Sequence, residues 1–255
     1  MENKTALLGS AFVAVLFCFA LPVISQSSAS CVPPDEIKPK LQGTPTVDVY
    51  NDLGVLFAKQ EKYNCAADAF GSSLQLDMNQ PNVKKVIFMF GVSLFYTGET
   101  KDAIASLQQA EQFGYREIKI HLILAAALDS IHSTAEAEKE WRATLDMDPE
   151  YTQALDALSD DLIGTGDYPG VIDLLERPRL LGQRTPKQSM NLGLAYVKSD
   201  KLDEAVRVLR DGLNTTPHSI ELANQLAGVL RQLGRNEEAD TVVKLAATDA
   251  ENAGH

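Results

Sequence analysis

Apolar residues recur along the chain with a period of 34 residues. In three separate series, the intervals between successive members are 37, 34, 34, 34 and 34 residues. The first series is apolar and comprises Leu53, Phe90, Leu124, Leu158, Leu192 and Leu226. The second, of mostly small residues, comprises Ala66, Ala103, Ala137, Val171, Ala205 and Ala239. The third is bulky and comprises Phe70, Leu107, Trp141, Leu175, Leu209 and Val243. Because the three series share one register, the pattern predicts a tandem repeat.

Each unit has the pattern of two amphipathic helices joined by a tight turn. A small residue, such as Gly54 or Gly193, follows each member of the first series and allows two helices to approach closely. Turn-forming pairs separate the two helices of a unit at Gly98-Glu99, Gly166-Asp167, Ser199-Asp200 and Gly234-Arg235. Pro149 and Pro217 stand where second helices should end. The expected fold class is all-α, with about six helix-turn-helix repeats.

The repeats account for most of the chain. The predicted units span residues 47–80, 84–117, 118–151, 152–185, 186–219 and 220–253, so the repeat region covers 47–253. Residues 31–46 contain four prolines and are expected to form an extended leader. Residues 1–30 have a different pattern, which is that of an export signal.

The motif inside each unit resembles the tetratricopeptide repeat, which has Leu-Gly-x-x-aromatic, then Ala, Phe and Pro within 34 residues. The first unit carries Leu53-Gly54-x-x-Phe57, Ala66 and Phe70, and the fifth carries Leu192-Gly193-x-x-Tyr196, Ala205, Leu209 and Pro217. The resemblance implies a right-handed α-solenoid in which each unit packs mainly on its neighbours. It also implies a non-catalytic scaffold that binds other proteins.

The fourth unit departs most from the motif. Val171 replaces its alanine, and Pro178 interrupts its second helix. The residues from Arg177 to Arg184 then lead toward the fifth unit. We expect a local irregularity or bend there.

In the family that the repeat resembles, the inner faces of the first helices form a concave groove that binds peptides or extended segments of partner proteins. The register of that groove implies partner-binding positions in the second, third and fifth units. They are Lys85, Phe88, Val92, Phe95 and Tyr96 in the second unit, Lys119, Leu122, Ala126, Asp129 and Ser130 in the third, and Lys187, Met190, Leu194, Val197 and Lys198 in the fifth.

The first helix of the second unit is apolar on almost every side from Val86 to Tyr96. A helix of this kind has to be covered all round. Two interpretations stay open for Phe88, Phe95 and Tyr96. They are either anchors for a partner, because exposed aromatic residues are frequent hot spots, or ordinary packing between helices.

The charge of the chain bears on the kind of partner. The formal net charge is -12, and an acidic protein repels nucleic-acid phosphates and anionic lipids. The sequence therefore predicts no nucleic-acid binding and favours a basic partner over an acidic one. Within the pair Asp160-Asp161, we place Asp160 on the concave surface, where it would contact a basic partner. A merely solvated position for Asp160 is the open alternative.

No residue pattern points to catalysis. The histidines are His121, His132, His218 and His255, and none has metal-motif spacing to a cysteine or another histidine. His121 falls in a first helix and is expected to be a packed or surface residue. The sequence thus predicts no enzyme activity, no cofactor and no small-molecule substrate. An enzyme that uses the repeats for docking is a weak alternative, because the chain leaves no room for a catalytic domain.

The first 30 residues have the order of a secretory signal peptide. Lys4 is followed by an almost unbroken apolar stretch from Ala6 to Ile24 and then by small polar residues. The resemblance inclines toward a bacterial host, with the protein in the periplasm or cell envelope. Two alternatives stay open: an uncleaved anchor, and lipidation at Cys31, for which Ser28 replaces the usual leucine. In either case the protein would be an anchored assembly factor for an outer-membrane or pilus machine, with membrane contact only through its N-terminus.

Export would also give the cysteines a role. Cys18 lies in the signal, so the mature chain would keep Cys31 and Cys65. In an oxidising compartment these two residues can form a disulfide bond that attaches the leader to the first repeat. Two unpaired thiols, with Cys65 as a small buried residue, are the alternative.

Overall fold

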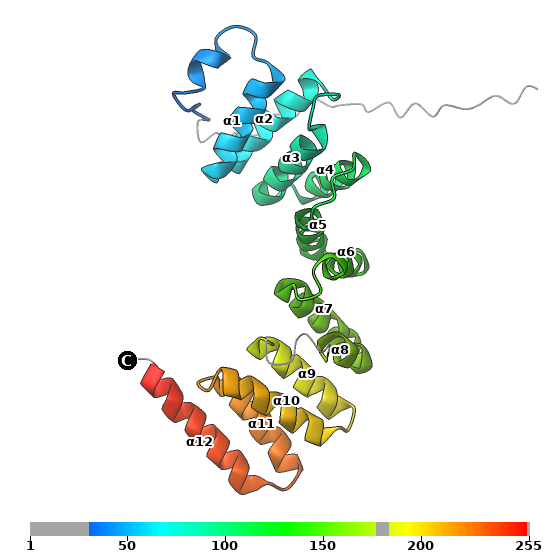
Figure 1. Cartoon of the computed structure of the whole chain (residues 1–255), viewed down its shortest axis with the longest axis vertical. Coiled ribbons are helices and arrows are strands. Elements are labelled where there is room, and N and C mark those ends of the chain that lie inside the picture. Colours follow the sequence, from blue (N-terminus) through cyan, green and yellow to red (C-terminus); the bar gives the residue numbers. More distant parts are fainter. Residues whose placement is uncertain (1–30, 177–183, 254–255) are drawn as a thin grey trace, which may run out of the picture. The chain divides into compact units, whose positions relative to one another are not determined.

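The computed structural model describes residues 31–176 and 184–253 (Figure 1). The described part from Pro33 onward belongs to one compact unit, and Cys31 and Val32 belong to a separate unit with the residues before them. The predicted signal at 1–30 lies outside the described residues. None of the described helices has both the length and the apolar character needed to cross a membrane.

Within the described ranges the chain forms twelve α-helices, one short 3-10 helix and no strand. The predicted all-α class is therefore confirmed. The 3-10 helix is η1 (Lys38–Leu41). The α-helices are α1 (Val47–Lys59), α2 (Tyr63–Leu76), α3 (Val83–Thr97), α4 (Thr100–Gln112), α5 (Ile118–Ser130), α6 (Thr134–Met147), α7 (Thr152–Thr165), α8 (Tyr168–Leu175), α9 (Pro186–Lys198), α10 (Leu202–Thr215), α11 (Ile220–Gln232) and α12 (Asn236–Ala253).

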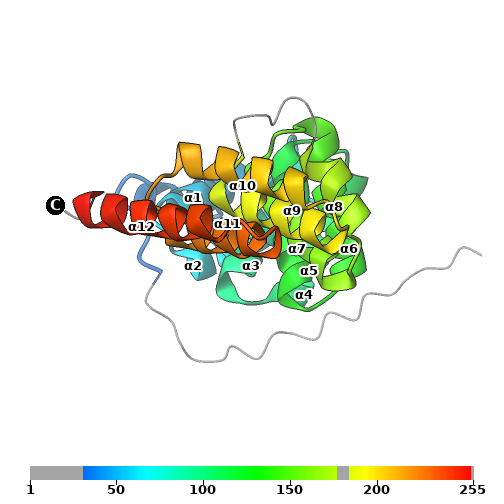
Figure 2. The same ribbon diagram turned by 90° about the horizontal axis from the view of Figure 1, so that it is seen from below.

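The helices form six consecutive hairpins, and each hairpin packs chiefly on the next one along the chain. Figures 1 and 2 show the two helices of a hairpin side by side, as for α11 and α12. Five of the first helices begin where a predicted unit begins, and α3 begins one residue earlier, at Val83. The 34-residue period thus locates the hairpins along the sequence.

A residue with positive φ closes every hairpin turn, always at the same register. Gly98, Gly166 and Gly234 have φ of 86°, 77° and 74°. The other three turns use Glu61, His132 and Asp200, with φ of 58°, 60° and 57°. This left-handed conformation ends the first helix and lets the second fold back against it. It is free of strain for glycine and costly for most other residues.

The two helices of a hairpin approach most closely where the first-series residue is followed by glycine. A Cβ atom added to Gly54 would lie 2.6 Å from the Phe70 ring, and one added to Gly193 would lie 2.7 Å from Leu209 Cδ2. Phe70 and Leu209 belong to the bulky series and are fully buried. The bulky residue of the second helix therefore fills the space that the missing side chain leaves.

The leader differs from the extended segment that its prolines predicted. Residues Lys38–Leu41 form the 3-10 helix η1, with a proline in its first turn. Ile37 precedes it and is only 4% exposed, within the same apolar cluster as Leu53. A proline is compatible with the first turn of a helix, and burial of Ile37 favours the compact form.

The second helix of the fourth unit is short, as its proline predicted. Helix α8 has eight residues and ends at Leu175, and the segment with Pro178 lies outside the described residues. Where the description resumes, the Arg184 side chain is buried. Its Nε donates a hydrogen bond to the carbonyl oxygen of Leu175 over 2.8 Å. This contact connects the end of α8 to the start of the fifth unit.

Candidate protein-binding groove

A pocket of ≈ 990 Å³ lies among the third, fourth and fifth units, and we call it the acidic pocket. Its walls come from α5, α6, α7, the loop before α7 and the first turn of α9. The lining residues are Ala126, Asp129, Trp141, Asp148, Glu150, Tyr151, Thr152, Gln153, Asp156, Ala157, Asp160, Asp161 and Lys187.

The acidic pocket occupies the groove register of the repeat. Gln153, Asp156 and Asp160 of α7 stand 34 residues after Lys119, Leu122 and Ala126 of α5. Lys187 of α9 stands another 34 residues after Gln153. The pocket is therefore formed mainly by one equivalent face of successive first helices, which is the face that the resemblance implies for partner binding.

Negative charge dominates this pocket. Its lining includes six carboxylates, from Asp129, Asp148, Glu150, Asp156, Asp160 and Asp161, and a single ammonium group. The Lys187 ammonium pairs with Asp160 across 2.6 Å and thereby joins α9 to α7. Asn191 Nδ2 also donates a hydrogen bond to Asp160 over 2.8 Å. Five carboxylates are left without a cation in the lining, so the pocket favours a positively charged ligand.

Hydrogen bonds from neighbouring helices hold two of these carboxylates in place. Trp141 Nε1 of α6 donates to Asp129 of α5 over 3.0 Å, and Gln188 Nε2 of α9 donates to Asp156 of α7 over 2.7 Å. Both donors are buried side chains. The carboxylates are thus oriented before any ligand arrives, which reduces the entropy lost on binding.

The carboxylates around Asp161 repel one another, and this repulsion contributes to a raised pKa of Asp161. Burial raises this pKa above its ordinary value of 3.8, and the negative charges of Asp129, Glu138 and Asp160 raise it further. A raised carboxyl pKa means that the surroundings disfavour the ionised form. A bound cation would relieve that cost.

The groove positions predicted in the second unit divide into two kinds. Phe88 is only 5% exposed and its ring stacks on Tyr115 with centroids 4.4 Å apart, so its prediction as a partner anchor is wrong. The reason is that Tyr115, in the loop after α4, covers it. Tyr96, in contrast, is 54% exposed and stacks on Tyr63.

Of the remaining groove positions, Ala126, Asp129, Asp160 and Lys187 line the acidic pocket, and the others lie outside it. The side chains outside the pocket fall into two groups by burial. Lys85, Lys119 and Lys198 are exposed, and Val92, Phe95, Leu122 and Leu194 are partly buried. The partner-binding role of these residues stays a prediction.

Sequence reasoning did not name most residues of the acidic pocket, among them Trp141 and Tyr151. Trp141 and Tyr151 lie in α6 and in the loop before α7, whereas the groove register covers only the first helix of each unit. Trp141 belongs to the bulky series, and it is buried. Its indole nitrogen nevertheless reaches Asp129 in the pocket wall. A polar atom on a buried aromatic residue usually finds a partner, and that rule was the available signal.

The two cysteines of the predicted mature chain are both disulfide-bonded. Cys65 lies in α2 and is buried. The pairing of Cys31 with Cys65 stays a prediction, which non-reducing peptide mapping can test.

Comparison with known proteins connects the repeat to characterised relatives. No protein-family model matches the sequence. Over 147 residues, or 58% of this chain, the sequence is 22% identical to the TPR repeat-containing protein YpiA of Bacillus subtilis (strain 168). The chain spans only 35% of the length of that relative.

Two solved structures share the arrangement of helices. A tetratricopeptide repeat protein from Parabacteroides merdae superposes with a TM-score of 0.59 and 15% identity, over 78% of this chain and 77% of the other. The C-terminal part of a TPR repeat-containing protein from Cytophaga hutchinsonii gives a TM-score of 0.61 and 15% identity, over 77% of this chain and 79% of the other.

These findings define the protein first by class: its six helical hairpins, each packed on the next, form an α-solenoid. Within that class, the 34-residue period and the superpositions give it the tetratricopeptide-repeat fold. The sequence-based expectation of this fold is therefore confirmed.

Proposed function

We propose that this protein is a non-catalytic scaffold that binds a basic, extended segment of a partner protein in the acidic pocket. The observation that carries the proposal is the pocket itself, which has six carboxylates and one lysine in its lining. Three of those carboxylates, from Asp129, Asp156 and Asp160, stand at the groove register. Lysine and arginine side chains of a partner would complement that charge, and their aliphatic stems would contact the partly exposed Tyr151.

An extended peptide suits the dimensions of the pocket. Successive repeats present equivalent positions, so a segment lying along the first helices meets carboxylates from α5 and α7 in turn. The volume of ≈ 990 Å³ is large enough for several side chains of such a segment. Binding of this kind requires no chemical step, and the carboxylates act only as charge and hydrogen-bond acceptors.

A fluorescence-anisotropy titration tests the proposal with three labelled decapeptides: one rich in Lys and Arg, one rich in Asp and Glu, and one uncharged. We expect binding of the basic peptide only, weakening as salt screens the charges. The variant Asp160→Asn/Asp161→Asn should weaken binding by about tenfold or more, because 1.4 kcal/mol of lost binding free energy is a tenfold effect.

The matched control is Asp173→Asn/Asp203→Asn, which removes the same charge from two exposed positions outside the pocket. It should bind the basic peptide as the unmodified protein does. Equal weakening in both double variants would contradict a specific pocket, because the attraction would then depend on net charge alone.

We also propose that the protein is exported to the periplasm or cell envelope of a bacterium. The support is the sequence of residues 1–30, with its apolar stretch and small polar residues. Intact-mass measurement of the protein from its host tests this. A chain that starts near Cys31 without modification supports export with cleavage, an acylated Cys31 supports the anchored assembly factor, and a full-length chain contradicts cleavage.

A further inference from the structure

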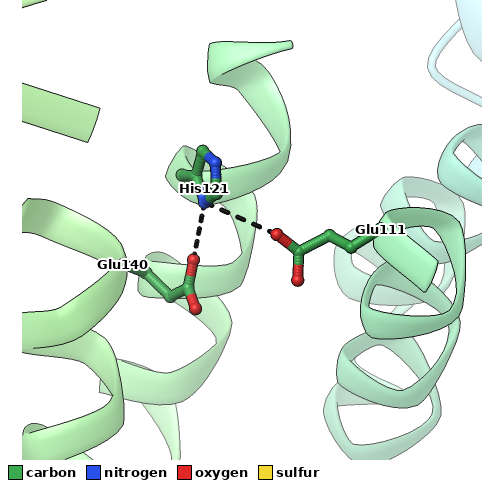
Figure 3. A group of neighbouring side chains, drawn as sticks. All are labelled: Glu111, His121 and Glu140. Carbon is green, nitrogen blue, oxygen red and sulfur yellow. Dashed lines mark hydrogen bonds and ion pairs between the residues drawn. The ribbon is translucent and has the colours of Figure 1, made fainter. Parts of the chain in front are cut away.

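A group of three titratable side chains lies outside the acidic pocket, where α4, α5 and α6 meet. Figure 3 shows Glu111, His121 and Glu140 converging, with the imidazole of His121 between the two carboxylates. His121 Nδ1 lies 2.7 Å from Glu140 Oε2 and 3.7 Å from Glu111 Oε1. Each residue belongs to a different helix, so the group joins the second and third units.

The three side chains of this group are partly buried. The side chains of Glu111, His121 and Glu140 are 28%, 17% and 15% exposed. Carboxylates at that depth are poorly hydrated and depend on a partner for their charge. An ion in water can still reach them.

Two cationic side chains, Arg116 and Lys139, act on this group from nearby. Arg116 is close, but its Nη1 donates to the main-chain carbonyl oxygens of Glu111 and Tyr115 rather than to a carboxylate. Burial and repulsion from Glu140 raise the pKa of Glu111 above its ordinary value of 4.5. Within the group itself two carboxylates flank one imidazole, so a divalent cation placed between them would be attracted by both.

We propose that Glu111, His121 and Glu140 form a binding site for a divalent transition-metal ion, with zinc as the best match. The three ligand atoms lie within 4.8 Å of one another. Ligands bound at 2.0–2.2 Å in a tetrahedral zinc site are separated by about 3.4 Å. Movement of about 1 Å, within the rotamer freedom of two glutamates, closes that difference.

The donor set selects the metal. One imidazole nitrogen and two carboxylate oxygens suit zinc, whereas calcium takes six to eight oxygen ligands and magnesium requires octahedral oxygen geometry. On binding, the imidazole Nδ1 gives up any proton it carries to the solvent and the metal takes its place between the carboxylates. Three protein ligands leave a fourth position for water or for a group on a partner.

Because the ligands come from three consecutive helices, the ion would hold the second hairpin against the third. Ligand binding to the folded state alone stabilises that state. The metal would therefore act on the stability of the solenoid and not on any reaction.

Isothermal titration calorimetry of untagged protein with zinc chloride tests the site, with calcium and magnesium chlorides as comparisons. We expect one zinc ion per chain, a rise in the melting temperature with zinc, and no binding of calcium or magnesium. His121→Ala and Glu111→Gln should weaken zinc binding at least tenfold. The matched controls His218→Ala and Glu204→Gln, at exposed positions outside the group, should leave it unchanged.

A variant that keeps the hydrogen bond separates metal binding from folding. His121→Gln retains an amide that can donate to Glu140 but provides no imidazole ligand, and circular dichroism will report its helix content. We expect a folded protein whose melting temperature no longer responds to zinc. The proposal would be overturned if folded His121→Gln bound as much zinc as the unmodified protein does. It would also be overturned if the unmodified protein bound no zinc.

Discussion

Asp161 lowers the stability of the folded protein while it contributes charge to the proposed binding pocket. It lines the acidic pocket, and burial together with neighbouring carboxylates raises its pKa above 3.8. The ionised form is then less favourable in the folded than in the unfolded chain. The cost appears as the pH rises through the unfolded-state pKa and is fully present above the folded-state pKa.

Asp161→Asn should therefore stabilise the protein at pH 7, by roughly half a kcal/mol given the partial exposure of the carboxylate. The gain should shrink as the pH falls through the raised folded-state pKa, and it should disappear below the unfolded-state pKa, where both states are protonated. Urea denaturation at pH 7 and at pH 3.5 measures the difference. The same substitution should weaken binding of the basic peptide, so that stability and binding change in opposite directions. Destabilisation at pH 7 would contradict this account.

The residue that closes each hairpin turn provides a second prediction at this scale. Glu61 adopts a φ of 58° where three other units have glycine. A left-handed residue other than Gly, Asn or Asp costs about 1–2 kcal/mol, partly offset by the greater chain entropy of glycine in the unfolded state. Glu61→Gly should raise the free energy of unfolding by about 0.5–1 kcal/mol.

Two comparisons in the same register check that interpretation by chemical denaturation. Asp200→Gly should raise the free energy of unfolding by less than Glu61→Gly does, because aspartate tolerates the left-handed region better. Gly98→Ala should lower the free energy of unfolding by about 1 kcal/mol. A Cβ at this position would meet no atom within 4 Å, so only the backbone conformation would be strained. An equal response at all three positions would show that φ does not control the turns.

At the scale of the helix, close packing within a hairpin outweighs helix propensity. A Cβ at Gly193 would approach Leu209 Cγ at 2.8 Å, and Leu209 is fully buried and has little room to move. Gly228 is also helical, but a Cβ there would meet nothing within 4 Å. Gly193→Ala should destabilise the protein by about 1–2 kcal/mol, because overpacking costs more than the helix propensity that alanine adds.

Gly228→Ala is the matched control and should stabilise the protein by about 0.5–1 kcal/mol through helix propensity alone. Melting temperatures of both variants, measured together, give the comparison. If both substitutions were stabilising, the close approach of α9 and α10 would not be a packing constraint.

The helices were predictable from the sequence because each unit repeats the same pattern of apolar and small residues at the contacts between its helices. A series such as Leu158 and Leu192 fixes the register, and the structure places α7 and α9 accordingly. Contacts that break the repeat were not predictable in the same way. The cover that Tyr115 places over Phe88 and the fold of the leader around Ile37 depend on loops that occur once in the chain.

At the scale of the whole molecule, both proposed sites lie between units rather than within one. The acidic pocket takes residues from three units, and the metal group takes residues from two. The repeat register placed Asp160 on the inner face of the first helices, and Asp160 lines the acidic pocket. It gave no signal for Glu111, His121 and Glu140, because their spacings of 10 and 19 residues match no metal-binding motif and only the packing of three helices brings them together.

The most direct test of the scaffold is photocrosslinking in the living host. A photoreactive amino acid replaces Gln153, an exposed residue in the wall of the acidic pocket, and in a second strain it replaces Gln232 at the end of α11. We predict that Gln153 crosslinks to one protein through a segment rich in Lys and Arg, and that Asp160→Asn/Asp161→Asn removes the crosslink. A crosslink of equal yield from Gln232, or an acidic or uncharged segment at Gln153, would contradict the account.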